Sequence, residues 1–331
     1  MVELEKEESK ESTLMRDSDN LRDGCAPTIQ DKFFNQMFAL HGFKNGHYIP
    51  LVFCLPIDKS VKTYEFVFTM IVEKCNTLGF LFSPKNTTVD FELAIHKPIE
   101  NVWPNTTIIG CRFHLTQSWW RNIQKCGLTS FYKDESSEIG KWIRYTFGLV
   151  FLNPDEVSNC FVEDLLSDYP VNEKLTNYCD YLTDTYISED GLFPPSIWAF
   201  NTSELIKTIN ACESFHSFFN KSFNHISPPI SAWLSVINEI QTEVYIKLNS
   251  LHLQRCPKNK KIIDRQQKNE EKIQKYKAGT INRESSIKIF GQKETWAKSE
   301  GSFLGEKSTT RSPDIHKNCN VPHLLEKVGD P

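Results

Sequence analysis

The sequence predicts an α/β fold, and three observations support this prediction. Two β-rich segments flank an Asn-Gly pair at residues 45–46. Between residues 61 and 125, segments with helical spacing of apolar residues alternate with short β-branched runs. After residue 128 the pattern becomes helical. Alternating strands and helices are typical of an α/β core with parallel strand pairing.

The first predicted elements form a β-hairpin. Residues 32–41 and 48–55 are rich in aromatic and branched side chains, and a turn at 44–47 separates them. The Asn-Gly pair in this turn suits the positive φ angles of a tight hairpin. We therefore expect two antiparallel strands here.

Helices and strands then alternate. We expect a helix at 61–74, a strand at 87–91, a helix at 92–102, a strand at 106–110 and a helix at 113–125. Apolar residues such as Tyr64 and Phe68 recur at helical spacing in the first of these helices. Pro98 is expected to kink or split its helix, because proline lacks the backbone N–H.

The rest of the chain predicts a helical insertion between two tails. Helices are expected at 138–152, 154–166, 171–187, 202–223 and 231–251. Residues 1–22 are rich in Glu, Ser and Asp without periodicity, which predicts a disordered acidic arm. The folded domain is expected at 23–252, with the insertion at about 128–202, and a basic, largely disordered tail at 253–331.

Charge is unevenly distributed along the 331 residues. The net charge is −4, but residues 251–331 hold 17 Lys and Arg against 10 Asp and Glu, a net of +7, which leaves −11 for the rest. Such a tail could contact phosphates or act in nuclear import, through Lys258, Lys260, Lys261 and Arg265. The alternative is a tail that is only solvated.

The composition indicates a chain that works away from membranes. Its 39% hydrophobic content is enough for a core, and it has no apolar run of membrane-spanning length and no secretory signal at its start. The ten cysteines form no Cys-x-x-Cys pair. We expect reduced thiols in the nucleus or the cytosol.

Asp90 is the first candidate for chemistry. It ends the predicted strand at 87–91, and ligands of α/β sheets usually bind at the carboxyl ends of strands. Carboxylates suit hard cations such as Mg²⁺ or Mn²⁺. Spacing alone selects no partner for Asp90, and a simple strand-end or helix-cap acid is the alternative.

Five segments together resemble the Mutator-like element (MULE) transposase domain, in particular the animal copies that accompany FLYWCH-type zinc fingers. The segments are FALHG at 38–42, NGHYIPLVF at 45–53, DFELA at 90–94, the stretch 104–121 with GCRFHL at 110–115, and NACESFH at 210–216. The resemblance covers about residues 33–248, and its specificity comes from the order of the segments.

The resemblance implies an RNase H-like fold with a helical insertion before the last acidic residue. It implies a catalytic triad of Asp23, Asp90 and Glu213 that holds Mg²⁺ or Mn²⁺ for cleavage and transfer of DNA strands. The expected location is the nucleus, or else the cytosol, and the expected partners are DNA and, as an option, a second copy of the chain.

The region around Asp23 departs from the family. Family members run an apolar strand into the first Asp and continue with Thr-Phe. Here residues 16–20 are poor strand material, and Cys25-Ala26 follows Gly24. The FLYWCH-type finger is absent too. We therefore expect a truncated or domesticated copy with impaired catalysis; the alternatives are a non-catalytic DNA- or protein-binding nuclear factor, or a fragment without function.

Two further hypotheses concern cysteine, histidine and tryptophan. Cys111 and His114 lie one helical turn apart, as do Cys212 and His216, and two such pairs could bind zinc. Ordinary buried side chains are the alternative reading. Trp119-Trp120 could stack on bases, but a core position on an amphipathic helix is the favoured reading.

Overall fold

A computed structural model describes residues 11–16, 37–44, 47–200, 215, 218–223, 228–250 and 260–292 of the chain. These residues all belong to one compact unit, Met1–Thr295. A second unit, Trp296–Pro331, lies outside the described residues.

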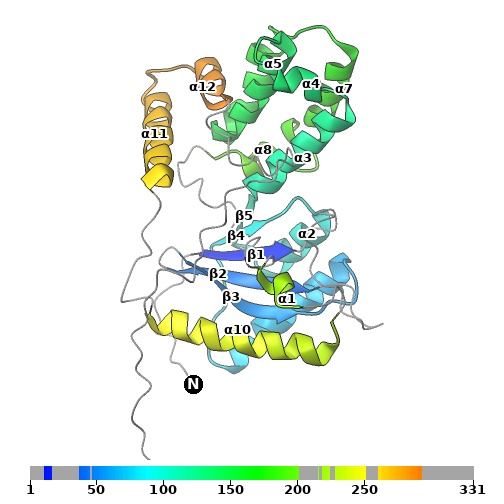
Figure 1. Cartoon of the computed structure of the whole chain (residues 1–331), viewed down its shortest axis with the longest axis vertical. Coiled ribbons are helices and arrows are strands. Elements are labelled where there is room, and N and C mark those ends of the chain that lie inside the picture. Colours follow the sequence, from blue (N-terminus) through cyan, green and yellow to red (C-terminus); the bar gives the residue numbers. More distant parts are fainter. Residues whose placement is uncertain are drawn as a thin grey trace, which may run out of the picture. The chain divides into compact units, whose positions relative to one another are not determined.

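The centre of the unit is a five-stranded mixed sheet, shown in Figure 1. Its strands are β1 (Glu11–Arg16), β2 (Phe38–Lys44), β3 (His47–Cys54), β4 (Asn86–Val89) and β5 (Thr107–Gly110). Their order across the sheet is β3-β2-β1-β4-β5. The pairs β1–β2 and β2–β3 are antiparallel, whereas β1–β4 and β4–β5 are parallel. The prediction of an α/β fold is thus confirmed.

The central strand β1 corrects the prediction for the N-terminal arm. We expected residues 1–22 to be disordered, but Glu11–Arg16 pair with β2 on one side and with β4 on the other. The ladder bonds that a strand gains from two neighbours do not show in its own composition. The folded part therefore begins before residue 23. Asp23 follows Arg16 by seven positions and lies outside the described residues.

The predicted hairpin is confirmed as β2 and β3. Their register runs from Phe38↔Cys54 to Lys44↔His47. The register shifts between Leu40 and His41, which leaves Leu51 as the extra residue of a β-bulge. Pro50 lies in β3, which is at the edge of the sheet, the place where strands tolerate proline.

Two helices pack on one face of this sheet. They are α1 (Val61–Thr77) and α2 (Leu93–Val102), and Ser60 caps α1 by accepting from the Thr63 N–H. Their buried side chains join those of the sheet in one core: Phe38, Leu40, Tyr64, Phe68, Ile71, Val89, Ile95, Ile99 and Trp103. α2 runs as one helix through Pro98, so of the two expected effects of this proline the split is wrong.

The opposite face packs against α10 (Ile230–Ser250). Met37 and the partly buried Phe53 of β3 meet Phe219, Trp233 and Ile240 in a second core. The sheet is therefore covered on both faces, as parallel pairing requires.

The predicted insertion is helical. The predicted helix at 113–125 is α3 (Arg112–Lys125), which precedes the insertion. The elements of the insertion are α4 (Thr129–Lys133), α5 (Glu138–Gly148), η1 (Leu149–Phe151), α6 (Pro154–Asn159), η2 (Cys160–Leu165), α7 (Glu173–Leu182), η3 (Thr183–Ile187) and α8 (Pro195–Trp198). The segments η2 and η3 are π-helical turns. Trp119 and Trp120 of α3 are buried, which confirms the interpretation that they are core residues.

The C-terminal helices correct the prediction for the tail. We expected residues 253–331 to be largely disordered, but α11 (Lys260–Lys277) and α12 (Arg283–Phe290) are folded. Phe290 stacks on Phe151 of the insertion, with ring centroids 4.1 Å apart and an interplanar angle of 6°. Ile273, Ile287 and Phe290 are fully buried. A few apolar residues spaced among charged ones are enough to dock these helices.

An ionic contact fastens the start of α12. The Arg283 Nε donates to Asp164 Oδ2 at 2.5 Å, and its Nη2 contacts Glu163. We expect Arg283→Ala to lower the free energy of unfolding by about 1 kcal/mol, because the pair is only partly shielded from water. Denaturant titration at low and high salt checks this, with Lys97→Ala, which removes an exposed pair with Glu100, as control. Equal losses in the two variants would contradict the prediction.

Among the described helices, none is both long and apolar enough to cross a membrane.

Candidate functional site

Asp90 lies at the carboxyl end of β4. The strand ends at Val89, whose carbonyl accepts from the Cys111 N–H at 2.7 Å, and α2 begins at Leu93. Asp90 and Cys111 therefore follow the ends of two adjacent parallel strands. This is the edge of a sheet at which α/β proteins bind ligands.

The Asp90 carboxylate is buried and incompletely paired. The residue is 9% exposed. Its Oδ1 has no hydrogen-bond partner within the described part of the chain. A buried polar atom without a partner is unfavourable, and such an atom calls for an explanation such as an ion or a catalytic role. The chemistry of this group fits a hard divalent cation.

The backbone of Asp90 is held by a histidine. His96 of α2 donates from Nε2 to the Asp90 carbonyl at 2.8 Å, and the contact is buried. The carbonyl can only accept, so Nε2 carries the proton. Sequence reasoning missed His96; the signal was its place between Ile95 and Ile99 on the buried side of α2.

The residue after Asp90 is fixed by aromatic packing. The Phe91 ring meets Tyr186 and Phe193 of the insertion edge-on, with centroids 5.7 and 5.1 Å away. A Cβ on Gly110 would come within 2.5 Å of the Phe91 ring and 3.2 Å of Ile197. The glycine at the end of β5 thus makes room for Phe91.

Four of the predicted site residues lie outside the described residues: Asp23, Cys212, Glu213 and His216. Phe215, two positions after Glu213, is described. Its ring contacts those of His41 in β2 and Phe53 in β3, with centroids 5.1 and 5.8 Å away.

The strand register relates Phe215 to Asp90. Thr88 pairs with Thr13 and, two residues on, Asp90 comes level with Met15, which pairs with Ala39. Ala39 in turn pairs with Phe53. Side chains in one row share a face of the sheet. Two strand spacings, about 10 Å, separate Asp90 from Ala39. Because Phe215 contacts Phe53, which belongs to the same row, Phe215 packs on the face toward which alternation directs Asp90.

Cys111 and His114 are both buried. Cys111 is a free thiol packed against Phe113 and Tyr48, and the His114 ring lies 5.4 Å from that of Phe113. In the described ranges, no three His, Cys, Asp or Glu side chains are grouped to hold a metal. The zinc hypothesis needs Cys212 and His216 and so stays a prediction.

Arg112 joins this edge of the sheet to the insertion. Its guanidinium lies 4.5 Å from the Phe151 ring centroid and donates to the Val150 carbonyl at 3.3 Å. Burial lowers the pKa of this guanidinium well below its ordinary value. These contacts give Arg112 a structural role, because they hold it against Val150 and Phe151 of the insertion.

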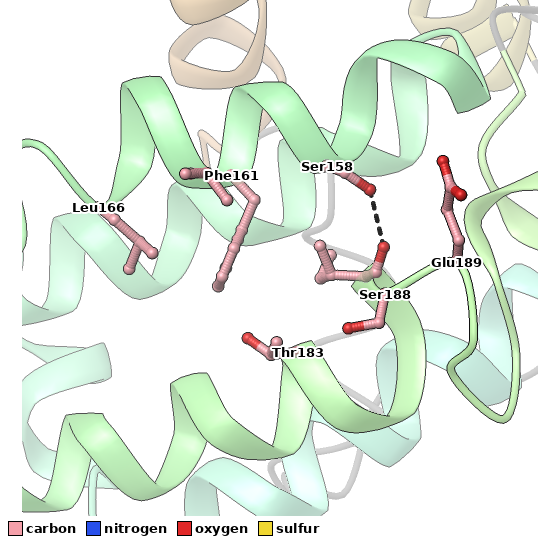
Figure 2. A pocket seen from close by; sticks show the side chains of 8 residues that line it. Ser158, Phe161, Leu166, Thr183, Ser188 and Glu189 are labelled. Carbon is pink, nitrogen blue, oxygen red and sulfur yellow. Dashed lines mark hydrogen bonds between the residues drawn. The ribbon is translucent and has the colours of Figure 1, made fainter.

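The insertion carries an open, mostly apolar pocket of about 370 Å³, shown in Figure 2. The two π-helical turns η2 and η3 contribute four of its eight lining residues, which are Ser158, Phe161, Val162, Leu166, Thr183, Ile187, Ser188 and Glu189. The Ser158 hydroxyl donates to the Ile187 carbonyl across it at 2.8 Å. None of the predicted site residues lines this pocket.

Comparisons of the chain with protein-family models, with curated proteins and with solved structures found no match.

Proposed function

We propose that the chain is a MULE-type transposase domain with an RNase H-like fold, which cleaves and joins DNA strands in the nucleus. In this proposal Asp90, Glu213 and the first-strand acid Asp23 hold Mg²⁺ or Mn²⁺. The position of Asp90 carries the proposal, because its buried carboxylate has an unpaired oxygen within the described part of the chain, at the carboxyl end of a strand next to the centre of the sheet.

The strand arrangement supports the RNase H-like part of the proposal. RNase H-like domains have a five-stranded mixed sheet whose first strand is central. Antiparallel strands lie on one side of it and parallel crossover strands on the other. The order β3-β2-β1-β4-β5 and the directions of these strands agree with that arrangement. The helical insertion before Glu213 agrees with the resemblance as well.

The neighbourhood of Phe215 supports the participation of Glu213. Phe215 packs on the side of the sheet toward which alternation directs Asp90. Glu213 precedes Phe215 by two positions in the sequence, and in this proposal it acts together with Asp90. Converging carboxylates are what two-metal chemistry needs.

The carboxylates have a defined task in this chemistry. Asp23, Asp90 and Glu213 would hold two divalent ions, which would activate a water or 3′-hydroxyl and stabilise the leaving oxygen. Asp90 contributes a buried oxygen that has no hydrogen-bond partner within the described part of the chain and would gain one from the metal. The surrounding aromatic side chains of Phe91 and Phe193 keep the peptide that carries it fixed.

A second candidate function is a non-catalytic DNA- or protein-binding nuclear factor. The observation that favours it is the departure of the sequence around Asp23 from the family, since Cys25-Ala26 stands after Gly24 in place of Thr-Phe. A triad that lacks one acid would keep the fold and lose the reaction.

A nicking assay with Mg²⁺ or Mn²⁺ tests the proposal. We expect the wild-type chain to nick supercoiled DNA and Asp90→Asn to be at least about 100-fold slower, equivalent to about 2.7 kcal/mol in the barrier. Asp190→Asn, an exposed acid in a turn of the insertion, is the matched control and should keep the rate. Equal nicking by wild type and Asp90→Asn removes the enzyme hypothesis. Absence of nicking by the wild type favours the second candidate.

The same assay identifies the first acid. The first three acids that follow β1 in the sequence are Asp17, Asp19 and Asp23. Loss of nicking in Asp23→Asn alone supports the assignment by resemblance, whereas loss in one of the other two variants transfers the role to that residue.

A further inference from the structure

The carbonyl of Asp90 lies after the last hydrogen bond of the β4–β5 ladder and before the first hydrogen bond of α2. The Cys111 N–H uses the carbonyl of Val89, the last residue of β4. The first turn of α2 starts from the Glu92 carbonyl, which accepts from the Ile95 N–H. Neither the strand ladder nor the helix supplies a donor to the Asp90 carbonyl; the His96 side chain does.

His96 is itself held in place. It is 6% exposed, and its ring lies 5.4 Å from that of Phe193. Phe193 also meets the Phe91 ring edge-on, at an interplanar angle of 90°. Phe193 therefore packs against two side chains next to the peptide bond between Asp90 and Phe91. One is the His96 imidazole, which donates to the Asp90 carbonyl, and the other is the Phe91 ring.

We infer that His96 is a positioning residue for the metal-binding carboxylate of Asp90. By fixing the plane of the peptide between Asp90 and Phe91, it sets the direction in which the Asp90 side chain leaves the backbone. Metal ligands need support of this kind, and loss of such a partner typically weakens metal affinity 10- to 100-fold. The inference rests on the proposed function, since it takes Asp90 as a ligand.

The test is Mn²⁺ affinity, measured by the electron paramagnetic resonance signal of free Mn²⁺ with the full chain. His96→Leu keeps the approximate volume and removes the donor, so we expect Mn²⁺ to bind about 10- to 100-fold more weakly. His96→Gln offers an amide N–H near the position of Nε2, so we expect its Kd within about threefold of wild type. Should the leucine variant not fold, His96→Asn, whose side chain is too short to reach, takes its place.

Two controls separate this role from a general loss of structure. Ser158→Ala removes another side-chain bond to a carbonyl, that of Ile187, and should leave the Mn²⁺ affinity unchanged. Asp90→Asn should abolish the site. Circular dichroism confirms that each variant is folded.

The outcomes distinguish the two proposals. If Asp90→Asn loses Mn²⁺ while His96→Leu or His96→Asn binds it as the wild type does, only the positioning role is overturned. A glutamine variant as weak as the leucine variant also overturns it, because the donor would then be irrelevant. Absence of a Mn²⁺ site in the wild type overturns the proposed function and this inference together.

Discussion

Replacing Trp119 with alanine is expected to lower the free energy of unfolding by about 3–5 kcal/mol. Trp119 is fully buried, and its ring lies 5.5–5.8 Å from those of Phe147, Tyr186 and Trp198, each met edge-on. Truncation to alanine leaves a cavity. The three surrounding aromatic rings cannot fill this cavity without giving up their own packing contacts. The loss is a large fraction of the roughly 5–15 kcal/mol that stabilises a typical protein.

Chemical denaturation followed by tryptophan fluorescence and circular dichroism measures this loss. Val162→Ala is the control, because Val162 is 59% exposed and its truncation should change stability by less than about 0.5 kcal/mol. A Trp119→Ala variant as stable as this control would contradict the core position of Trp119. The hypothesis that Trp119 stacks on bases would then have to be considered again.

Gly148→Val is expected to detach α12 and to lower the free energy of unfolding by about 2–3 kcal/mol. A Cβ at this position would lie 2.3 Å from the Ile287 carbonyl oxygen and 2.6 Å from its Cα. These are backbone atoms, so the clash cannot be relieved by a side-chain rotation. α12 must move away from α5, and Phe290 then leaves Phe151.

Hydrogen exchange of peptides from residues 260–292 detects this detachment. Protection in α12 should fall in Gly148→Val, while the sheet stays protected. Gly279→Ala serves as control: Gly279 has a φ of +68° and no atom within 4 Å of an added Cβ, so the substitution adds backbone strain without a clash. Unchanged protection in the valine variant would show that the C-terminal helices do not depend on this contact.

Local pattern was enough to predict most elements. The hairpin, the two helix–strand alternations after it and the helices of the insertion follow from apolar spacing and from the Asn-Gly turn. Tyr64, Phe68 and Ile71 recur at helical spacing and face the core as predicted. Such patterns work because side-chain direction follows the period of the element.

Two errors share one physical cause. β1 lies in an acidic segment without periodicity, and α11 and α12 lie in a charged one. Their order comes from partners distant in the sequence: β2 and β4 for the strand, and Phe151, Gly148 and Asp164 for the helices. Ladder bonds and docking contacts of this kind leave little trace in the segment that receives them.

The sequence by itself determined which acid stands at a strand end, because Asp90 follows a β-branched run and precedes a helix. It also determined, through the order of its segments, the resemblance on which the proposed function rests. Only the tertiary structure decided that the strand of Asp90 lies next to a central β1, and that His96 and Phe193 fix the peptide that carries the carboxylate. The reason is that strand neighbours and side-chain contacts between distant residues depend on how elements pack, and local spacing does not encode that packing.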